Sequence, residues 1–187
     1  GDVGDFDAMA EMVKKIVAGV GSVDVLVNCA GITHDSQFRK MSKQDWDSVI
    51  NINLNGAFNV TRHVIDAMVE RGWGRIINIS SVNGQKGQFG QASYSAAKAG
   101  LHGFTKALAQ EVIRHGVTVN SISPGYVSTD LVMAIRPEVR EKIVAQIPAG
   151  RLAHPEEIGH RVAYLASDKA AFITGANMAV NGEQHMF

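Results

Sequence analysis

The sequence predicts an α/β protein built on a doubly wound parallel sheet. Short β-branched runs alternate along the chain with longer stretches of helical period, which is the rhythm of repeated βα units. The short runs, such as VDVLV and RIINI, are almost continuously apolar, as is typical of strands covered on both faces. A length of 187 residues with 45% hydrophobic and 19% charged residues fits one globular domain.

Four segments are predicted as strands, and each ends in small or polar residues. They are residues 23–27, 75–79, 117–122 and, more weakly, 177–180. The helical candidates between them are residues 6–18, 42–71, 94–114, 136–146 and 155–167. The last of these opens with Pro155 followed by Glu156 and Glu157, which favours a helix N-terminus.

The helix predicted over residues 42–71 has a clear start and a clear buried face. Ser42 can cap it together with Asp45 three residues later. An apolar stripe at helical spacing follows, formed by Trp46, Val49, Ile50, Ala57, Val64 and Met68. Asn53 falls on this stripe. A buried asparagine is most often a hydrogen-bonded structural amide, so this position alone does not indicate a function.

Charge and cysteine content narrow the classes of partner and compartment. Eighteen basic residues balance eighteen acidic ones, so the molecule offers no overall field for nucleic acid or an anionic membrane. The single cysteine, Cys29, excludes an internal disulfide and suits a reducing compartment. No apolar run has the length of a membrane span, and the beginning of the sequence has no signal-peptide pattern. We therefore expect a cytoplasmic protein without a membrane or nucleic-acid partner.

The segments that follow the strands are the first place to look for chemistry, because open parallel sheets bind ligands beyond the carboxyl ends of their strands. The first strand is followed by Asn-Cys-Ala-Gly at 28–31, and the third runs into a Pro-Gly turn at 124–125. The second is followed by Ser80 and Ser81 and a glycine-rich loop whose spacing is not that of a phosphate-binding turn. Each of these segments alone also fits an ordinary turn or loop.

Tyr94 and Lys98 lie four residues apart and therefore share one face of a predicted helix. A nearby ammonium lowers the pKa of a tyrosine, which would make the phenol a better acid or base near neutral pH. An isolated tyrosine and lysine at this spacing usually belong only to the polar side of an amphipathic helix, with the lysine side chain extended along it. Ser81, at the end of a strand, could supply a second hydroxyl to the same substrate oxygen.

Together these residues resemble the short-chain dehydrogenase/reductase family over essentially the whole chain. Residues 28–31 are similar to its Asn-Asn-Ala-Gly element, and Asn53, Ser81, Tyr94 and Lys98 match its catalytic tetrad. Pro124 and Gly125 with Thr129 are similar to the segment over the nicotinamide. The run from NISSVNGQKGQFG to KALAQEV is similar to bacterial acetoacetyl-CoA reductases. The resemblance implies a Rossmann-like sheet with family strand order 3-2-1-4-5-6-7.

The resemblance also implies a role for each residue of the tetrad. Tyr94 would donate a proton to a ketone oxygen while hydride arrives from the nicotinamide, and Ser81 would hydrogen-bond that oxygen. Lys98 would lower the pKa of Tyr94 and bind the nicotinamide ribose, and Asn53 would hold a water that links Lys98 to solvent. The implied cofactor is NADP(H), with NAD(H) as the alternative, and no metal. The implied cofactor-binding residues are Asp2, Val3, Asn28, Ala30, Gly31, Tyr94, Lys98, Pro124, Gly125, Val127 and Thr129.

The loop between Ser81 and Tyr94 must fold over the site and is expected to touch the acyl group. Its candidates, besides Ser81 itself, are Gln88, Phe89 and Gln91, with Tyr126 from the turn after the third strand. Amides and aromatic rings suit a short polar acyl chain better than a long fatty one. For the CoA phosphates the candidates are Lys86 or the cluster Arg39, Lys40 and Lys43, although a charge run is usually a solvated face.

The sequence lacks the glycine-rich turn between strand and helix that holds a cofactor pyrophosphate in this family. It opens with Gly1, Asp2 and Val3, which resemble the end of the family's third strand, where an aspartate meets the adenine. Two βα units, roughly 60 residues, are therefore expected to be missing, and the element that selects NADP over NAD with them. Residues 1–187 then form a single domain, the C-terminal three quarters of the family's fold. The strand at 23–27 becomes an exposed apolar edge.

Three functions remain open from the sequence. The first is reduction of a 3-ketoacyl-CoA to the (R)-3-hydroxyacyl-CoA, and the second is reduction of the 3-ketoacyl-carrier-protein thioester, which needs the same catalytic residues. The third is a non-catalytic fragment, or a degenerate protein, that binds NADPH poorly. The family also implies a homotetramer, with the helices at 42–71 and 94–114 forming one interface.

Overall fold

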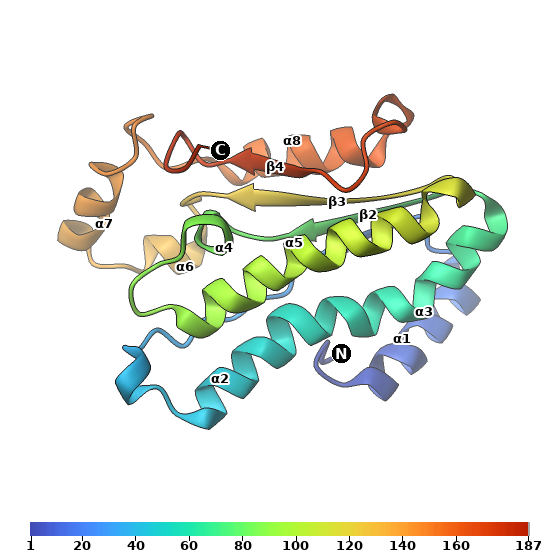
Figure 1. Ribbon diagram of the computed structural model, residues 1–187, viewed down its shortest axis with the longest axis horizontal. Helices are drawn as coiled ribbons and strands as arrows, with labels where there is room; N and C mark the ends of the chain where they lie inside the picture. Colours follow the sequence, from blue (N-terminus) through green and yellow to red (C-terminus); the bar gives the residue numbers. More distant parts are fainter. Residues whose placement is uncertain (187) are drawn as a thin grey trace.

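The computed structural model describes residues 1–186 and shows an α/β fold with one parallel sheet (Figure 1). The sheet has four strands in the order β1-β2-β3-β4, all paired in parallel. The strands are β1 (Val25–Asn28), β2 (Gly74–Ile79), β3 (Val117–Pro124) and β4 (Asn177–Val180). The strand order in space therefore follows the order in the chain, as the resemblance implied.

Helices cover both faces of the sheet, with α1, α3 and α5 on one face and α8 on the other (Figure 1). The helices are α1 (Phe6–Val20), α2 (Lys43–Ile50), α3 (Gly56–Arg71), α4 (Val82–Lys86), α5 (Ala92–Val112), α6 (Asp130–Met133), α7 (Pro137–Val144) and α8 (Pro155–Ala166). A π-helix, η2 (Asn51–Asn55), joins α2 to α3, and short 3-10 turns lie at η1 (Phe38–Lys40), η3 (Ile113–His115) and η4 (Asp168–Ala170). No helix within residues 1–186 is both long and apolar enough to cross a membrane.

Alternate side chains of the strands enter two separate cores, because neighbouring residues of a strand point to opposite faces. Ile76 of β2 packs in the core under α1, α3 and α5, where Val64 and Met68 also lie. The next residue, Ile77, packs with Ile122 and Leu165 on the α8 side. This is why the predicted strands carry apolar residues at successive positions.

The predicted elements are confirmed, with shifts at their ends. β1 begins two residues later than predicted and ends at Asn28, and β3 runs on to Pro124. Two short helices were missed, α4 with five residues and α6 with four. The sequence of α4, VNGQK, reads as a loop because of its glycine, but the hydroxyl of Ser81 caps it by accepting the Asn83 N–H at 3.1 Å.

The predicted helix 42–71 is continuous but contains the π-turn η2. Its start is a capping box in which the Asp45 N–H donates to the Ser42 hydroxyl at 3.0 Å. In η2 the Gly56 N–H donates to the Asn51 carbonyl, one residue further back than in an α-helix. Turns of this kind are frequent at functional sites, and this one contains Asn53.

β1 lies at one edge of the sheet and pairs only with β2 among the described residues. Val25 and Val27 are each 37% exposed. The prediction of an exposed apolar edge is confirmed.

Candidate active site

The carboxyl ends of the strands meet at one end of the sheet, the end to which the arrows in Figure 1 point and where α4 and α6 lie. Lys98 comes to this end from α5, and its Nζ lies 5.7 Å from the centre of the Tyr94 ring. The phenol of Tyr94 is hydrogen-bonded to the Ser81 side chain. A Cβ placed on Gly31 would lie 3.4 Å from Lys98 Nζ and 3.5 Å from Asn53 Oδ1. The four predicted tetrad residues therefore converge on one site.

Tyr94 differs from the expectation in the direction of its pKa. Burial raises the pKa of the phenol above its ordinary value, and the hydrogen bond with Ser81 only partly offsets this, while the charge of Asp35 raises it further. Lys98 is not among the groups that shift it. The pKa of Tyr94 is therefore raised and not lowered as expected, because burial of the phenol dominates the shift.

Lys98 is almost completely buried, with 3% of its surface exposed. Its Nζ donates a hydrogen bond to the Ile79 carbonyl at 2.8 Å, and its own carbonyl accepts one from the Ser80 hydroxyl at 2.8 Å. Burial lowers the pKa of the amine to about 8. The side chain is thus fixed at the end of β2 and titrates close to neutral pH.

Asn53 is a satisfied buried amide, as the sequence pattern alone suggested, and it also faces the site. It is 2% exposed, and both ends of its amide bond the backbone of Ile32. Oδ1 accepts the Ile32 N–H at 2.8 Å and Nδ2 donates to the Ile32 carbonyl at 2.9 Å. Asn53 therefore holds the loop after β1 against η2, close to Lys98. That it also binds a water remains a prediction.

Several predicted cofactor residues line a cavity of about 270 Å³ beside the end of β1. Val3, Asn28, Ala30 and Asn53 are among its walls. The Asn28 side chain is committed inside the fold, since Nδ2 donates to Asn78 Oδ1 at 2.8 Å and lies 3.1 Å from Thr61 Oγ1. Asn28 can therefore meet a ligand mainly through its backbone.

The other predicted cofactor residues lie in two segments, one before α1 and one after β3. The Asp2 carboxylate is exposed and accepts the Gly4 N–H at 2.8 Å. After β3, the Gly125 N–H donates to the Val180 carbonyl at 2.9 Å, and Val127 forms a parallel bridge with Ala153. The Thr129 N–H donates to the Val127 carbonyl at 2.7 Å, which closes the turn that follows Pro124. The segment 124–129 is therefore held by its backbone.

Gly31 lies beside two polar groups of the site, Lys98 Nζ and Asn53 Oδ1. A Cβ added to Gly31 would lie 3.4 Å from Lys98 Nζ and 3.5 Å from Asn53 Oδ1, which is van der Waals contact with both. The backbone of Gly31 therefore faces these two groups. The cavity beside it runs along the edge of β1 between α1 and α3 and is lined mainly by their apolar side chains, with Asn28 and Asn53 as polar groups. The described residues bring together no group of three His, Cys, Asp or Glu that could hold a metal ion.

The predicted substrate residues are not equivalent in the structure. Gln91 is committed to the protein, because Oε1 accepts from Asn83 and Nε2 donates to Asp35, both at 2.9 Å. Gln88 is exposed, with its Oε1 accepting from Lys86 Nζ at 3.3 Å, and the side chain of Phe89 is 81% exposed. Tyr126 is half-buried, and burial raises the pKa of its phenol.

Sequence analysis missed Asp35 and Asn83, which join the two loops that border the site. Asp35 accepts from Gln91, and the neighbouring Ser36 N–H donates to the Gly90 carbonyl at 2.8 Å. The loop after β1 is therefore tied to the loop after α4. The signal that could have found Asp35 is its place, since it is an acidic residue in a loop that follows a strand at its carboxyl end.

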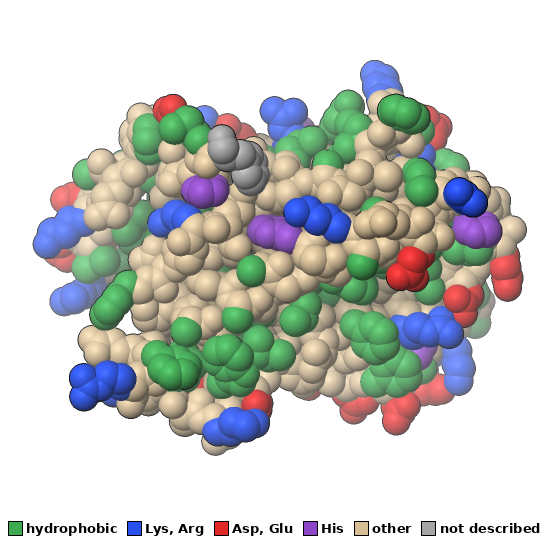
Figure 2. All heavy atoms as spheres, in the orientation of Figure 1, with side chains coloured by type: hydrophobic (Ala, Val, Ile, Leu, Met, Phe, Trp, Pro, Cys, Tyr) green, Lys and Arg blue, Asp and Glu red, His purple; other side chains and the backbone are tan. Residues whose placement is uncertain are grey.

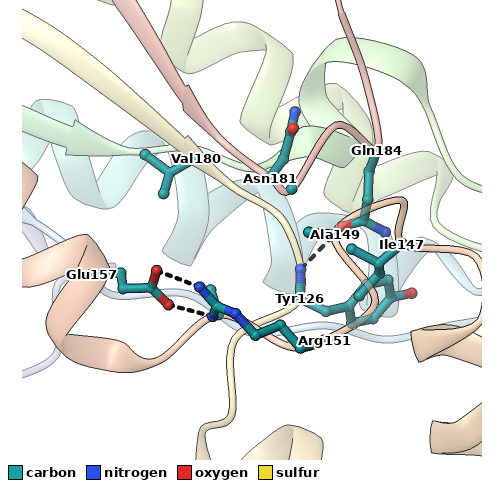
Figure 3. A pocket seen from close by; sticks show the side chains of 10 residues that line it. Tyr126, Ile147, Ala149, Arg151, Glu157, Val180, Asn181 and Gln184 are labelled. Carbon is teal, nitrogen blue, oxygen red and sulfur yellow. Dashed lines mark hydrogen bonds and ion pairs between the residues drawn. The ribbon is translucent and has the colours of Figure 1, made fainter.

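A second, smaller cavity of about 80 Å³ is lined by Tyr126 together with Asn181 and Gln184 of the C-terminal segment (Figure 3). The Gln184 side chain enters it and accepts the Tyr126 N–H at 3.2 Å. Its far wall is the ion pair of Arg151 and Glu157, with bonds of 2.7 and 2.8 Å. The C-terminal segment is therefore joined through Gln184 to the turn that carries Tyr126.

Comparison with known proteins decides the family. A protein family described as enoyl-(acyl carrier protein) reductase matches residues 1–183. An acetoacetyl-CoA reductase of Allochromatium vinosum is 60% identical over 181 residues, 97% of this chain and 74% of the relative. The chain belongs to the short-chain dehydrogenase/reductase family.

Further members of the short-chain dehydrogenase/reductase family show the same extent of similarity. An acetoacetyl-CoA reductase of Cupriavidus necator is 60% identical over 186 residues, 100% of this chain and 76% of the relative. The 3-oxoacyl-(acyl-carrier-protein) reductase of Escherichia coli is 46% identical over 185 residues, 99% of this chain and 76% of the relative. The family is one of oxidoreductases, and the tetrad geometry agrees with this class.

The buried lysine of this short-chain dehydrogenase/reductase predicts a pH-dependent stability. Because the folded-state pKa of Lys98 is about 8 and its ordinary value is 10.5, the unfolded chain binds more protons between these two values. The free energy of unfolding therefore rises with pH across this window. In Lys98→Met this contribution is absent. From pH 7 to pH 10 the free energy of unfolding of the native protein should therefore rise by roughly 2 kcal/mol more than that of the variant.

Urea unfolding of both proteins at the two pH values measures this gain. The comparison cancels the titration of all other groups, which the two proteins share. An equal change of stability with pH in native protein and variant would contradict the lowered pKa.

Proposed function

We propose that the protein reduces a 3-ketoacyl-CoA, acetoacetyl-CoA in the first place, to the (R)-3-hydroxyacyl-CoA with NADPH. The observation that carries the proposal is the convergence of Ser81, Tyr94 and Lys98 at the carboxyl ends of the strands. The substrate is suggested by relatives named acetoacetyl-CoA reductase at 60% identity over nearly the whole chain.

The catalytic step needs proton donors aimed at the ketone oxygen, because negative charge develops on that oxygen during reduction. Tyr94 and Ser81, whose side chains share a hydrogen bond, would both donate to it. The raised pKa of Tyr94 keeps the phenol protonated at neutral pH, so it has a proton to give. A bound nicotinamide would supply the hydride.

Lys98 would support this proton transfer from its place over the ring of Tyr94, with Nζ 5.7 Å from the ring centre. With a pKa of about 8 its amine is mostly protonated at neutral pH and can exchange a proton near physiological conditions. Asn53 fixes the loop that carries Gly31 and Ile32 beside it. We infer that Asn53 also holds a water through which Lys98 recovers a proton from solvent.

The cofactor would lie along the cavity beside β1 and the turn after β3. Asp2 and Val3 would meet the adenine end, Ala30 and Gly31 the middle, and the segment 124–129 the nicotinamide. Within that segment Pro124, Gly125, Val127 and Thr129 are the proposed contacts. NADPH is preferred over NADH on the resemblance to the acetoacetyl-CoA reductases. A cytoplasmic location is proposed on the single cysteine, Cys29, which suits a reducing compartment.

The acyl group would be met by Gln88, Phe89 and Tyr126 at the mouth of the site. Gln91 would act by holding the loop, because its amide is already bonded to Asn83 and Asp35. For the CoA phosphates Lys40 and Arg39 remain the better candidates, since Lys43 donates to both carboxylate oxygens of Asp47 at 2.6–2.7 Å.

Steady-state reduction of acetoacetyl-CoA by the full-length protein, with NADPH and with NADH in parallel, tests the proposal. We expect turnover with acetoacetyl-CoA, a lower KM for NADPH than for NADH, and the (R) product. Turnover with the acetoacetyl-carrier-protein thioester and none with acetoacetyl-CoA would replace the proposal by the second candidate. That candidate is favoured by the 46% identity to the 3-oxoacyl-(acyl-carrier-protein) reductase. No turnover and no dinucleotide binding would leave the non-catalytic alternative.

A homotetramer is the proposed assembly, with α2, α3 and α5 forming one interface. Figure 2 shows hydrophobic side chains gathered on the part of this face where Figure 1 places α2, α3 and the start of α5. Phe58 on α3, for example, is 50% exposed. Light scattering after size-exclusion chromatography should give four times the chain mass, and Phe58→Lys should shift it toward smaller species. A monomeric native protein would contradict this assembly.

A further inference from the structure

Polar side chains along one side of η2 and α3 bind the backbone of residues 3–6. Asn51 Nδ2 donates to the Gly4 carbonyl at 3.2 Å, and Asn59 Nδ2 donates to the Val3 carbonyl at 2.8 Å. His63 Nε2 lies 3.1 Å from the Phe6 carbonyl. These partners are far apart in the sequence, so the contacts fix the segment before α1 to a helix that follows β1.

Asn59 makes the shortest of these bonds and is the best shielded from solvent of the three, at 6% exposed. The side chain of Val3 is fixed at the same place, because a Cβ on Gly56 would lie 2.8 Å from Val3 Cγ2. Val3 is therefore held twice, by its carbonyl on Asn59 and by its side chain on Gly56.

Val3 is also a wall of the 270 Å³ cavity that Ala30 and Asn53 border. Asn59 is not among the residues that line this cavity. The direct contact of Asn59 with the wall of this cavity is its hydrogen bond to the Val3 carbonyl. The neighbouring Asp2 moves with the same turn, since its carboxylate accepts the Gly4 N–H at 2.8 Å.

We propose that Asn59 is a positioning residue for the adenine end of the dinucleotide, acting through the Val3 carbonyl. This inference rests on the proposed function, in which Asp2 and Val3 receive the adenine. A displaced Val3 would alter the adenine end of the cavity and leave the tetrad in place, because Lys98 is fixed by contacts with β2 and Asn53 by its two bonds to Ile32. Loss of the Asn59 donor should therefore weaken cofactor binding and spare the chemical step.

The test compares Asn59→Leu, which keeps the size of the side chain without the donor, with native full-length protein. Calorimetry is expected to show about tenfold weaker binding of NADPH and of adenosine 2′,5′-bisphosphate, which carries the adenine end alone. The KM for acetoacetyl-CoA and the kcat at saturating NADPH should stay unchanged. Hydrogen exchange of the amides at residues 2–6 should become faster.

The matched control is Asn55→Leu, one helical turn earlier. Asn55 is exposed and donates to Asn51 Oδ1 at 3.2 Å. Its replacement keeps the Asn59 donor to Val3 and the Asn51 Nδ2 donor to Gly4, so both affinities should stay unchanged. If Asn59→Leu does not fold, Asn59→Ser, whose side chain is too short to reach the Val3 carbonyl, provides the same comparison.

The outcomes separate the two proposals. Native protein that binds neither NADPH nor NADH would overturn the proposed function, whereas the hydrogen-exchange comparison would still report on the Val3 contact. Native protein that binds NADPH while Asn59→Leu binds it equally well would overturn the positioning role alone. A lower melting temperature of Asn59→Leu with unchanged affinities would show a structural role only and would also overturn it.

Discussion

Tyr94→Phe should lower the kcat/KM for ketoacyl reduction by about 10²–10⁴-fold, the range for loss of a general acid. The phenyl ring keeps the packing of Tyr94, but the hydroxyl that shares a hydrogen bond with Ser81 is lost. Because the proton is needed in the transition state, kcat should fall while the dissociation constant for NADPH changes little. Steady-state kinetics together with calorimetric NADPH binding measure the two effects separately.

Tyr126→Phe is the matched control for this substitution. Tyr126 is also partly buried, and burial raises the pKa of its phenol, yet Ser81 is not among the groups that act on it. We expect a changed KM for the acyl substrate and a kcat close to that of the native protein. Turnover by Tyr94→Phe at the native rate would remove Tyr94 from its role as the acid.

Gly116→Ala should destabilise the fold by about 3 kcal/mol or more. Gly116 lies in the turn before β3 with φ of 71°, a left-handed backbone that an L residue adopts at a cost. In addition, a Cβ at this position would overlap the Gly72 carbonyl oxygen. The turns that precede β2 and β3 would have to move apart. Urea unfolding of the two proteins measures the loss.

Gly72→Ala separates the two causes. Gly72 has nearly the same backbone angle, φ of 70°, but a Cβ there would have no neighbour within 4 Å. Only the backbone term of about 1–2 kcal/mol should then be lost. Equal decreases in the free energy of unfolding for Gly72→Ala and Gly116→Ala would show that the overlap of the new Cβ with the Gly72 carbonyl adds no destabilisation.

Three members of the tetrad carry local signals in the sequence, whereas Asn53 is identified only by the family resemblance. Tyr94 and Lys98 share a helix at a spacing of four, and Ser81 lies just after a strand, so period and position are enough to bring them to one end of a parallel sheet. The four strands and their order followed from the same patterns and from the family resemblance.

The rest of the site depends on contacts between distant segments. The bond from Asn59 to Val3 spans 56 residues, and so does the bond from Gln91 to Asp35. No periodicity marks either pair. The direction of the Tyr94 pKa could not be predicted for a related reason, because the spacing from Lys98 gives the neighbouring charge but not the degree of burial.

The π-turn η2 makes the spacing of the chain around Asn53 sensitive to length. Its extra residue per turn sets the phase between the Ser42 cap and the side chains of α3. Deleting one residue here would rotate everything on one side of it by roughly 100° relative to the other. Asn53 could then no longer bind the backbone of Ile32 while Asn59 binds the carbonyl of Val3. Two loops that flank the cavity are therefore kept in register by a single backbone irregularity, so this helix should tolerate substitutions at many positions but no change in its number of residues.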